Sequence, residues 1–161
     1  MWKTRCPLVV FAVLALTVPS SAFARPRLGP TERSVVARVN AVRAEHGLAR
    51  VQAAGGLNRA ADAHSADMLA HDFFAHESSD GTPFDRRVRR YRDATMLGEN
   101  LAALSGAADP AAMVVRMWMD SPGHREILLT AGFRRIGVAA RTGQLGADRM
   151  MVVTADFASR R

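Results

Sequence analysis

The sequence predicts one α/β sandwich domain, in which helices pack against a small antiparallel sheet. In the N-terminal half, apolar residues recur every three or four positions over two stretches, which is the period of an amphipathic helix. An Asp-Pro pair at 109–110 starts a further helical pattern. Towards the C-terminus, "RRIGVAAR" and "DRMMVVTADF" have the character of strands, and the turn "TGQLGA" between them completes a hairpin.

The first 24 residues are predicted to be a signal peptide and not part of the domain. Lys3 and Arg5 precede an apolar run of about 11 residues, and "AFA" at 22–24 has the small-x-small form that signal peptidase accepts. The run is shorter than the roughly 20 residues that a membrane-spanning helix needs, and no later stretch approaches that length. We therefore expect cleavage after Ala24 and a secreted or periplasmic protein that is not transmembrane.

Cysteine count and net charge narrow the class of protein further. The only cysteine, Cys6, lies in the predicted signal peptide, so we expect a mature chain without disulfides that is stabilised by packing. The formal net charge is +7, and removal of Lys3 and Arg5 leaves +5, carried by arginines. This charge is most simply a solvated basic surface; the alternative is an anionic partner, such as lipid headgroups or acidic wall polymers.

Two helices are predicted after a flexible, Pro/Gly-rich arm at residues 25–30. The first spans about 32–46, with Thr31 as its N-terminal cap and Gly47 as its stop. The second carries a stripe of residues at helical spacing, and this inner face is small and partly polar. The stripe consists of Leu57, Ala61, His64, Met68 and His71.

Loops and short elements alternate in the middle of the chain. "ESSDGTP" at 77–83 has the composition of a loop, and "FDRRVRRYR" that of a short basic helix or turn. "MLGENLAAL" at 96–104 is a third strand candidate. The helix that Asp109 caps ends at "SPG", residues 121–123, and has a wide apolar face formed by Met113, Val114, Met117 and Trp118.

The five histidines of the mature chain fall into three groups. His46 precedes the glycine that ends the first helix, where a cation complements the helix C-terminus, so we expect it to cap that helix. His64 and His71 lie on the stripe of the second helix, where a histidine is usually a hydrogen-bonded core residue. His76 and His124 lie in irregular segments, where side chains can face a cleft.

Glu99, an acid between apolar residues in "LGENLA", completes a candidate site with His76 and His124. Two neutral imidazoles and a carboxylate are a common ligand set of catalytic zinc sites with one open position. Separations of 23 and 25 residues match no local zinc signature, so spacing alone gives this metal hypothesis little support.

Two other chemistries find still less support in the sequence. Ser121 is three residues before His124, but no G-x-S-x-G elbow surrounds it, so a serine nucleophile is not favoured. The run "RRVRRYR" has Tyr91 as its one aromatic residue and lacks the stacking platform of single-strand binders. We therefore expect no nucleic-acid partner.

Five fragments occur in a characteristic order: "VNAVRAEHGL", "AHSADMLAHDFFAHESSDG", "GENLA", "MWMDSPGHREILL" and "RIGVAA". Together they resemble the CAP superfamily of cysteine-rich secretory, antigen 5 and pathogenesis-related proteins, specifically its bacterial SCP-like extracellular domains. The resemblance covers about residues 34–157 and implies a single domain at 31–161. The implied fold is a three-layer α-β-α sandwich with a small central antiparallel sheet flanked by helices.

The resemblance also implies a cavity on which residues matching His76, Glu99 and His124 converge, and which holds a divalent metal such as zinc in some members. The fourth cavity acid of the animal and plant members is replaced here by Ser121, and the neighbouring Asp120 is expected to point elsewhere. We therefore expect weak zinc binding by the two histidines and Glu99, and no other cofactor. The residues expected to support the cavity are Asn40, Arg43, His64, Asn100 and Trp118.

Three hypotheses for the function follow. In the first, the protein is a secreted, non-enzymatic module that binds a lipid, a sterol or a cell-envelope component in the cavity. In the second, it is a metal-assisted hydrolase, a protease or nuclease acting outside the cytoplasm, with His76 and His124 as ligands and Glu99 as ligand or general base. In the third, the cluster is purely structural. A serine at 121 in place of an acid disfavours a strong metal site and therefore the hydrolase.

Overall fold

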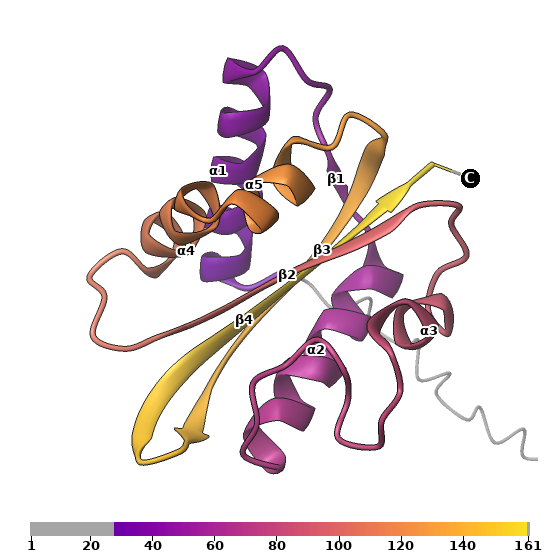
Figure 1. Ribbon diagram of the computed structural model, residues 1–161. Coiled ribbons are helices and arrows are strands. Elements are labelled where there is room, and N and C mark those ends of the chain that lie inside the picture. Colours follow the sequence, from indigo (N-terminus) through magenta and orange to yellow (C-terminus); the bar gives the residue numbers. More distant parts are fainter. Residues whose placement is uncertain (1–27, 161) are drawn as a thin grey trace, which may run out of the picture.

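The computed structural model describes residues 28–160 and shows five helices around a four-stranded sheet (Figure 1). The predicted signal peptide at 1–24, and all but the last three residues of the arm at 25–30, lie outside the described residues. In chain order the elements are α1 (Pro30–Glu45), β1 (Gln52–Ala53), α2 (Gly55–Ala70), α3 (Phe84–Arg89), β2 (Leu97–Leu104), α4 (Pro110–Asp120), α5 (Pro122–Leu129), β3 (Phe133–Leu145) and β4 (Asp148–Ser159).

The strands are arranged in the order β1-β3-β4-β2. β3 and β4 form a long antiparallel hairpin, and β2 pairs antiparallel with the other edge of β4. β1 pairs in parallel with the start of β3 over two residues. The predicted small antiparallel sheet is therefore confirmed, with a short parallel strand added at one edge.

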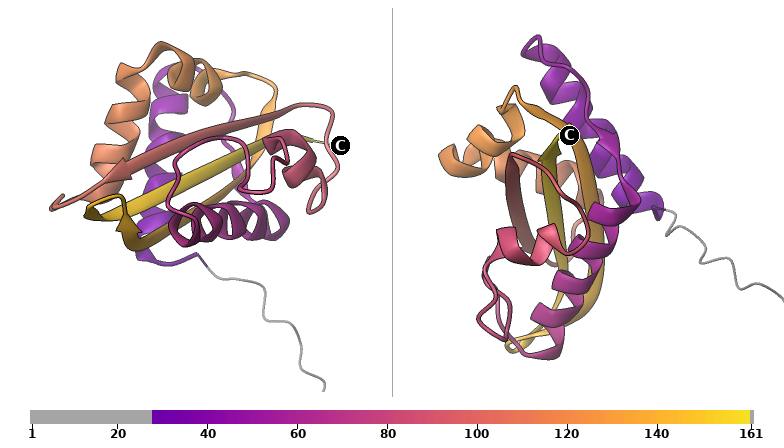
Figure 2. Two further views of the ribbon diagram at one scale, coloured as in Figure 1. Left: turned by 60° about the horizontal axis from the view of Figure 1, so that its bottom comes forward. Right: turned by 90° about the vertical axis from the view of Figure 1, so that its right-hand side faces the viewer.

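Helices cover both faces of the sheet, which gives the predicted three layers. α1, α4 and α5 lie on one face, and α2 and α3 lie on the other (Figure 1, Figure 2). On the first face, Val39 and Trp118 pack in one core with Val138 of the sheet. On the second face, Leu57 and Val88 belong to a separate core at the start of β2 and the end of β4. Strand residues alternate between these two cores because successive side chains point to opposite faces.

α2 approaches β3 most closely at Gly137. A Cβ at this position would lie 2.1 Å from the carbonyl carbon of Leu57 and 2.4 Å from the amide nitrogen of Asn58. The missing side chain therefore lets the helix backbone rest on the strand. Asn58 fixes the contact, because its Oδ1 accepts a hydrogen bond from the backbone N–H of Val138 at 3.2 Å.

The predicted N-terminal cap is correct for α4 and wrong for α1. Asp109 caps α4 as predicted, and its Oδ1 accepts a hydrogen bond from the Ala112 N–H at 3.0 Å. α1 begins at Pro30 after Gly29, so the predicted cap at Thr31 is wrong. Proline at the first helical position has a suitable φ and lacks an N–H that would need a partner, which favours the earlier start.

Two histidines close helices, and the prediction for one of them is wrong. His46 is the C-terminal cap of α1, as expected, and its Nδ1 donates a hydrogen bond to the Val42 carbonyl oxygen at 2.8 Å. His71 follows the last turn of α2, where its side chain is 59% exposed and pairs with Asp67. It does not belong to the buried stripe, because α2 ends at Ala70 and the chain turns away there.

Candidate functional site

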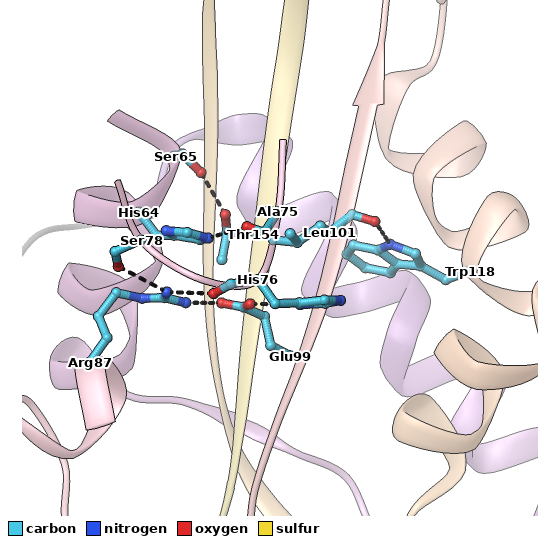
Figure 3. Close-up of polar contacts among 10 residues, drawn as sticks. All are labelled: His64, Ser65, Ala75, His76, Ser78, Arg87, Glu99, Leu101, Trp118 and Thr154. Atoms are coloured by element: carbon cyan, nitrogen blue, oxygen red, sulfur yellow. Dashed lines mark hydrogen bonds and ion pairs between the residues drawn. The ribbon is translucent and has the colours of Figure 1, made fainter. Parts of the chain in front are cut away.

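Glu99, on β2, is the centre of a buried polar cluster. Its side chain is 1% exposed, and it lies between Arg87 and His76 (Figure 3). Its Oε1 accepts a hydrogen bond from His76 Nδ1 at 2.8 Å, and its Oε2 accepts one from Arg87 Nη2. A buried carboxylate needs such partners, because water no longer solvates its charge. Both of its oxygens are therefore committed within the protein.

Arg87 reaches Glu99 from α3, and its side chain is only 6% exposed. Its Nη1 donates to the backbone oxygen of His76 at 2.9 Å and to Ser78 Oγ at 3.4 Å. One guanidinium group thus joins β2 to the loop that carries His76. The planar fork of arginine can serve these partners together, which the single ammonium of lysine cannot.

His64 holds the same loop from α2. It is fully buried, and its Nε2 donates a hydrogen bond to the Ala75 carbonyl oxygen at 2.9 Å (Figure 3). Burial is the main cause that lowers the pKa of His64 below its ordinary value, although the negative charge of Glu99 partly opposes the shift. A neutral imidazole with its proton on Nε2 therefore fixes the residue that precedes His76.

His124 lies in the first turn of α5 and not in the irregular segment expected from the sequence, because α5 already begins at Pro122. Its backbone oxygen accepts a hydrogen bond from Asn100 Nδ2 at 3.0 Å, which ties α5 to β2. Burial lowers the pKa of the His124 imidazole, and the neighbouring His76 lowers it further. The imidazole is therefore uncharged near neutral pH.

Trp118 fixes α4 to the edge of the sheet. It is buried, and its indole Nε1 donates a hydrogen bond to the backbone oxygen of Leu101 at 2.8 Å (Figure 3). Ser121 alone separates α4 from α5. The indole therefore also helps to set where α5 begins and where His124 projects.

These elements enclose a cleft of about 430 Å³. The four cavity residues predicted from the sequence all line it, whereas the exposed Asp120 does not. The residues that line the cleft are His76, Phe84, Leu97, Gly98, Glu99, Asn100, Ser121, Gly123, His124 and Ile127.

Asn40 and Arg43 lie away from the cleft and hold the backbone that carries it. Asn40 exchanges two hydrogen bonds with the backbone of Val51, at 3.0 and 2.8 Å. Arg43 is fully buried and donates to the backbone oxygens of Ala49, Leu128, Thr130 and Phe133. These bonds join α1 to the end of α5 and to the start of β3.

Asp156 belongs to the same polar cluster as Glu99. It is the partner of Glu99 in the β2–β4 register and is fully buried. Within residues 28–160, no N–H or O–H donor is bonded to either of its carboxyl oxygens, so a hydrogen bond between Asp156 and Glu99 needs a proton on one of the two carboxyl groups. Burial, and then the negative charge of Glu99, raise the pKa of Asp156 well above its ordinary value. The protonated, uncharged form is therefore favoured at this position.

Sequence analysis missed Arg87 and Asp156, although each has a weak signal. Arg87 follows Phe84 by three positions and precedes the buried Val88, so helical spacing places it on the inner face of α3. Asp156 is an acid between apolar residues of a predicted strand, the same context that singled out Glu99. Both signals are local, and neither shows that the two residues meet.

The side chains as they stand do not form the predicted three-ligand zinc set. Within residues 28–160, no three His, Cys, Asp or Glu side chains are placed to hold a metal ion together. Glu99 is turned towards Arg87, and Nδ1 of His76 is bonded to Glu99, so the free ring nitrogens of His76 and His124 remain. A zinc ion bound here would therefore depend on two imidazoles, and the set that includes Glu99 stays a prediction.

Known sequences match most of this domain. The profile of the cysteine-rich secretory protein (CAP) family matches residues 36–157. Identity is 38% over 108 residues to the uncharacterised protein YkwD of Bacillus subtilis, and 33% over 109 residues to the uncharacterised membrane protein YlbC of the same organism. The matches cover 66% and 67% of this chain but 41% and 31% of the relatives, so the chain spans less than half of their length.

Solved structures share the fold. An extracellular protein with an SCP domain from Bacillus anthracis gives a TM-score of 0.66 at 24% identity, over 83% of this chain and 45% of that one. An outer surface protein of Borrelia burgdorferi gives 0.66 at 18% identity, over 81% and 93%. Within residues 28–160, every helix falls short of the length and apolar character needed to span a bilayer. The family profile covers most of the domain and the fold agrees with it, so the chain belongs to the cysteine-rich secretory protein (CAP) family.

Proposed function

We propose that the protein is an exported CAP module that binds a small ligand in the cleft without chemically changing it. The ligand is a lipid, a sterol or a component of the cell envelope. Export is supported by the signal-peptide features of residues 1–24 and by the extracellular SCP-domain protein among the similar structures. Exposed arginines of α3, such as Arg86 and Arg89, give the module a basic face for anionic surfaces.

The observation that carries this proposal is the commitment of Glu99 inside the wall of the cleft. A general base or metal ligand needs a free lone pair directed at water, substrate or metal. Each carboxylate oxygen of Glu99 instead accepts one hydrogen bond, from His76 or Arg87, and with 1% of the side chain exposed the remaining lone pairs are closed off from water and substrate. The cleft therefore has apolar and polar lining residues, and its one acid has a structural role. Such a cleft is better suited to binding a ligand than to catalysing a reaction.

A metal-assisted hydrolase is the second candidate, and one observation favours it. The bond from His76 Nδ1 to Glu99 orients the imidazole and leaves Nε2 free, as in carboxylate–histidine pairs that activate a nucleophile or bind a metal. Such activity requires turnover that disappears in Glu99→Gln at an unchanged melting temperature. A purely structural cluster, the third hypothesis, would bind neither ligand nor metal.

Zinc titration by calorimetry tests the shared site. We expect weak binding to the mature protein, micromolar or poorer, because two imidazoles without a free carboxylate make an incomplete site. His76→Ala and His124→Ala should each weaken binding by at least about tenfold, since each removes one of the two ligands. His46→Ala removes a histidine outside the cleft and serves as the control.

Two outcomes would contradict the zinc prediction. Equal affinity in the parent and in both cleft variants would show that zinc binds elsewhere. Nanomolar affinity that also requires Glu99 would show that Glu99 leaves Arg87 to join the metal, which would favour the hydrolase.

A further inference from the structure

β2 is the last strand of the sheet, and one of its edges is unpaired. Among the strands of residues 28–160, β4 is its only neighbour. β2 runs over eight residues, "LGENLAAL", without the proline, lysine or bulge that often blocks such an edge. Its one charged side chain, Glu99, points towards Arg87 of α3 and not along the edge. The backbone of β2 can therefore hydrogen-bond to a further strand.

The pairing with β4 shows which backbone groups of β2 face outward. In an antiparallel pair, alternate residues turn their N–H and C=O towards the neighbouring strand. The Met96 oxygen accepts a hydrogen bond from the Ser159 N–H at 3.0 Å, so the even-numbered residues of β2 face β4 and the odd-numbered ones face away. The Leu101 oxygen agrees with this, because it accepts the indole N–H of Trp118 from α4 (Figure 3).

Leu97 and Glu99 carry the free part of this edge. Within residues 28–160, no hydrogen bond reaches the backbone N–H or C=O of either residue. Glu99 as a whole is 5% exposed although its side chain is only 1% exposed, so its open surface is on the backbone. Beyond it, the indole of Trp118 occupies the Leu101 oxygen and ends the free stretch. Two N–H donors and two C=O acceptors are thus available to a partner.

The free edge forms the floor of the cleft of about 430 Å³, which residues 97–100 of β2 line in succession. His76 and Phe84 form the wall on the α3 side, and His124 and Ile127 form the wall on the α5 side. The right-hand view of Figure 2 shows β2 at the edge of the sheet between these two layers. The edge is therefore recessed between two walls.

An extended peptide has the chemistry that matches such an edge. Its N–H and C=O groups repeat at the spacing of those of β2, so it can pair with donors and acceptors together. Its side chains alternate between two faces, and successive ones would meet the half-buried Phe84 and Ile127. Acidic residues at its ends would complement the net positive charge of the chain.

We infer that β2 binds an extended peptide segment of a partner protein by strand addition, over about four residues along the floor of the cleft. Such a partner goes beyond the small ligand proposed above, because the backbone of β2 recognises it and not the side chains of the cleft. A second copy of this chain does not fit, since the same two walls flank its own β2 and would collide before the edges came within about 4.8 Å.

A blocked peptide, acetyl-Glu-Val-Thr-Val-Thr-Glu-amide, tests this strand addition against an analogue in which the Val and Thr nitrogens are methylated. The analogue keeps every side chain and loses the donors that face β2. Both peptides are titrated into the mature protein and followed by NMR. We expect methylation to raise the Kd by at least about tenfold, because hydrogen bonds to the edge are lost.

Hydrogen exchange of the β2 amides locates the peptide. In the free protein, the amides of Leu97 and Glu99 should exchange faster than those of Gly98 and Asn100, which face β4. Peptide at about ten times its Kd should slow exchange at Leu97 and Glu99 about tenfold. The amides of Gly98 and Asn100 should not change, and they serve as controls within the same strand.

Two variants of one residue separate the backbone donor from the side chain. Leu97→Pro removes the outward N–H at the first position of β2, where an edge strand accepts proline, and Leu97→Ala shortens the same side chain but keeps the N–H. We expect Leu97→Pro to bind the unmethylated peptide at least about tenfold more weakly than Leu97→Ala. Melting temperatures check that both variants fold, and the methylated peptide decides if Leu97→Pro does not.

Two results would overturn strand addition. Equal affinity for the two peptides, with exchange unchanged at Leu97 and Glu99, would show that side chains alone bind the peptide; the proposed small ligand would be unaffected, because it does not need the edge. Protection of the same two amides that grows with protein concentration, without peptide, would show that a second copy occupies the edge.

Discussion

Two buried carboxyl groups, Glu99 and Asp156, lie side by side and share the charge of one buried cation, Arg87. Like charges this close cannot both be stable away from water. Arg87 bonds to Glu99, so Glu99 is the stable anion and Asp156 is the group whose ionisation is disfavoured. The cluster therefore has one ion pair at its centre and one acid that is better off protonated.

Asp156→Asn tests this division of charge. The folded state holds the Asp156 proton more tightly than the unfolded state, so the parent loses stability as pH rises from about 4 through the raised pKa. Asparagine keeps the shape and has no proton to lose. We expect Asp156→Asn to have a free energy of unfolding higher than that of the parent by about 1 kcal/mol or more at pH 8, with the difference shrinking towards pH 4. Urea unfolding at pH 4, 6 and 8 measures it.

A difference that stays the same at all three pH values would show that Asp156 does not titrate within this range. A variant that is less stable than the parent at pH 8 would show that the native carboxylate is ionised and bonded. Either result would mean that Asp156 is not the protonated group of the cluster.

The sequence predicts the candidate site by its motif order and misses its internal bonding. Residue type and local context single out His76, Glu99 and His124, and the order of the family-like fragments predicts that they share a cavity; all three line one cleft. Helical spacing places Arg87 on the inner face of α3, but its bond to Glu99 depends on how α3 packs against β2, and no local spacing reports that. Asp156 likewise acquires its role from a strand register between segments more than 50 residues apart.

At the scale of elements, the sequence predicts those that carry their own signal. Helices with regular apolar spacing and the C-terminal hairpin were expected and are present. β1 was not expected, because two residues have no pattern and become a strand only by pairing with β3. The sequence predicts only a helix end at residues 121–123, because Pro122 and Gly123 are typical of a stop, but both occupy the first turn of α5. Proline is well suited to that position.

The contact between α2 and β3 is expected to be disrupted by a single added methyl group at Gly137. Gly137→Ala would place a methyl group about 2 Å from the backbone of Leu57, and helix backbone cannot rotate aside as a side chain can. The helix must move off the sheet, so we expect a loss of about 3 kcal/mol in the free energy of unfolding. Urea unfolding of the variant and the parent at one pH measures the loss.

Gly143→Ala is the matched control on the same strand and face. Its Cβ would meet side-chain atoms of Leu69 at 3.1 Å, and a leucine side chain can shift. We expect a change below about 1 kcal/mol for this variant. Equal losses in the two variants would show that the close approach at Gly137 is not what holds α2 in place.

For the whole molecule, stability rests on packing and on buried polar groups, since the described residues contain no cysteine. Their ionisable members act in opposite directions as pH changes. Burial lowers the pKa of His64 and of His124, so acid favours the unfolded chain, where these imidazoles take up protons freely. Asp156 has a raised pKa and favours the folded state in acid. Between about pH 6.5 and pH 4 the two histidines are therefore the groups that destabilise the fold, and in stronger acid Asp67 and Asp80, whose pKa values are lowered, add to the effect.

His64→Gln tests how much His64 contributes to the pH dependence of stability. Glutamine can place an N–H near the position of Nε2 and keep the bond to the Ala75 carbonyl oxygen, but it takes up no proton. In the parent, the unfolded chain binds one more proton at His64 than the folded chain once pH falls below about 6.5. Stability then falls by up to about 1.4 kcal/mol per pH unit until the lowered pKa is reached.

We expect His64→Gln to flatten the decline in the free energy of unfolding between pH 7 and pH 5, measured by urea denaturation at half-unit steps. An equally steep decline in the variant would show that His64 is already protonated in the folded protein, and that the loop before His76 is held by a charged imidazole.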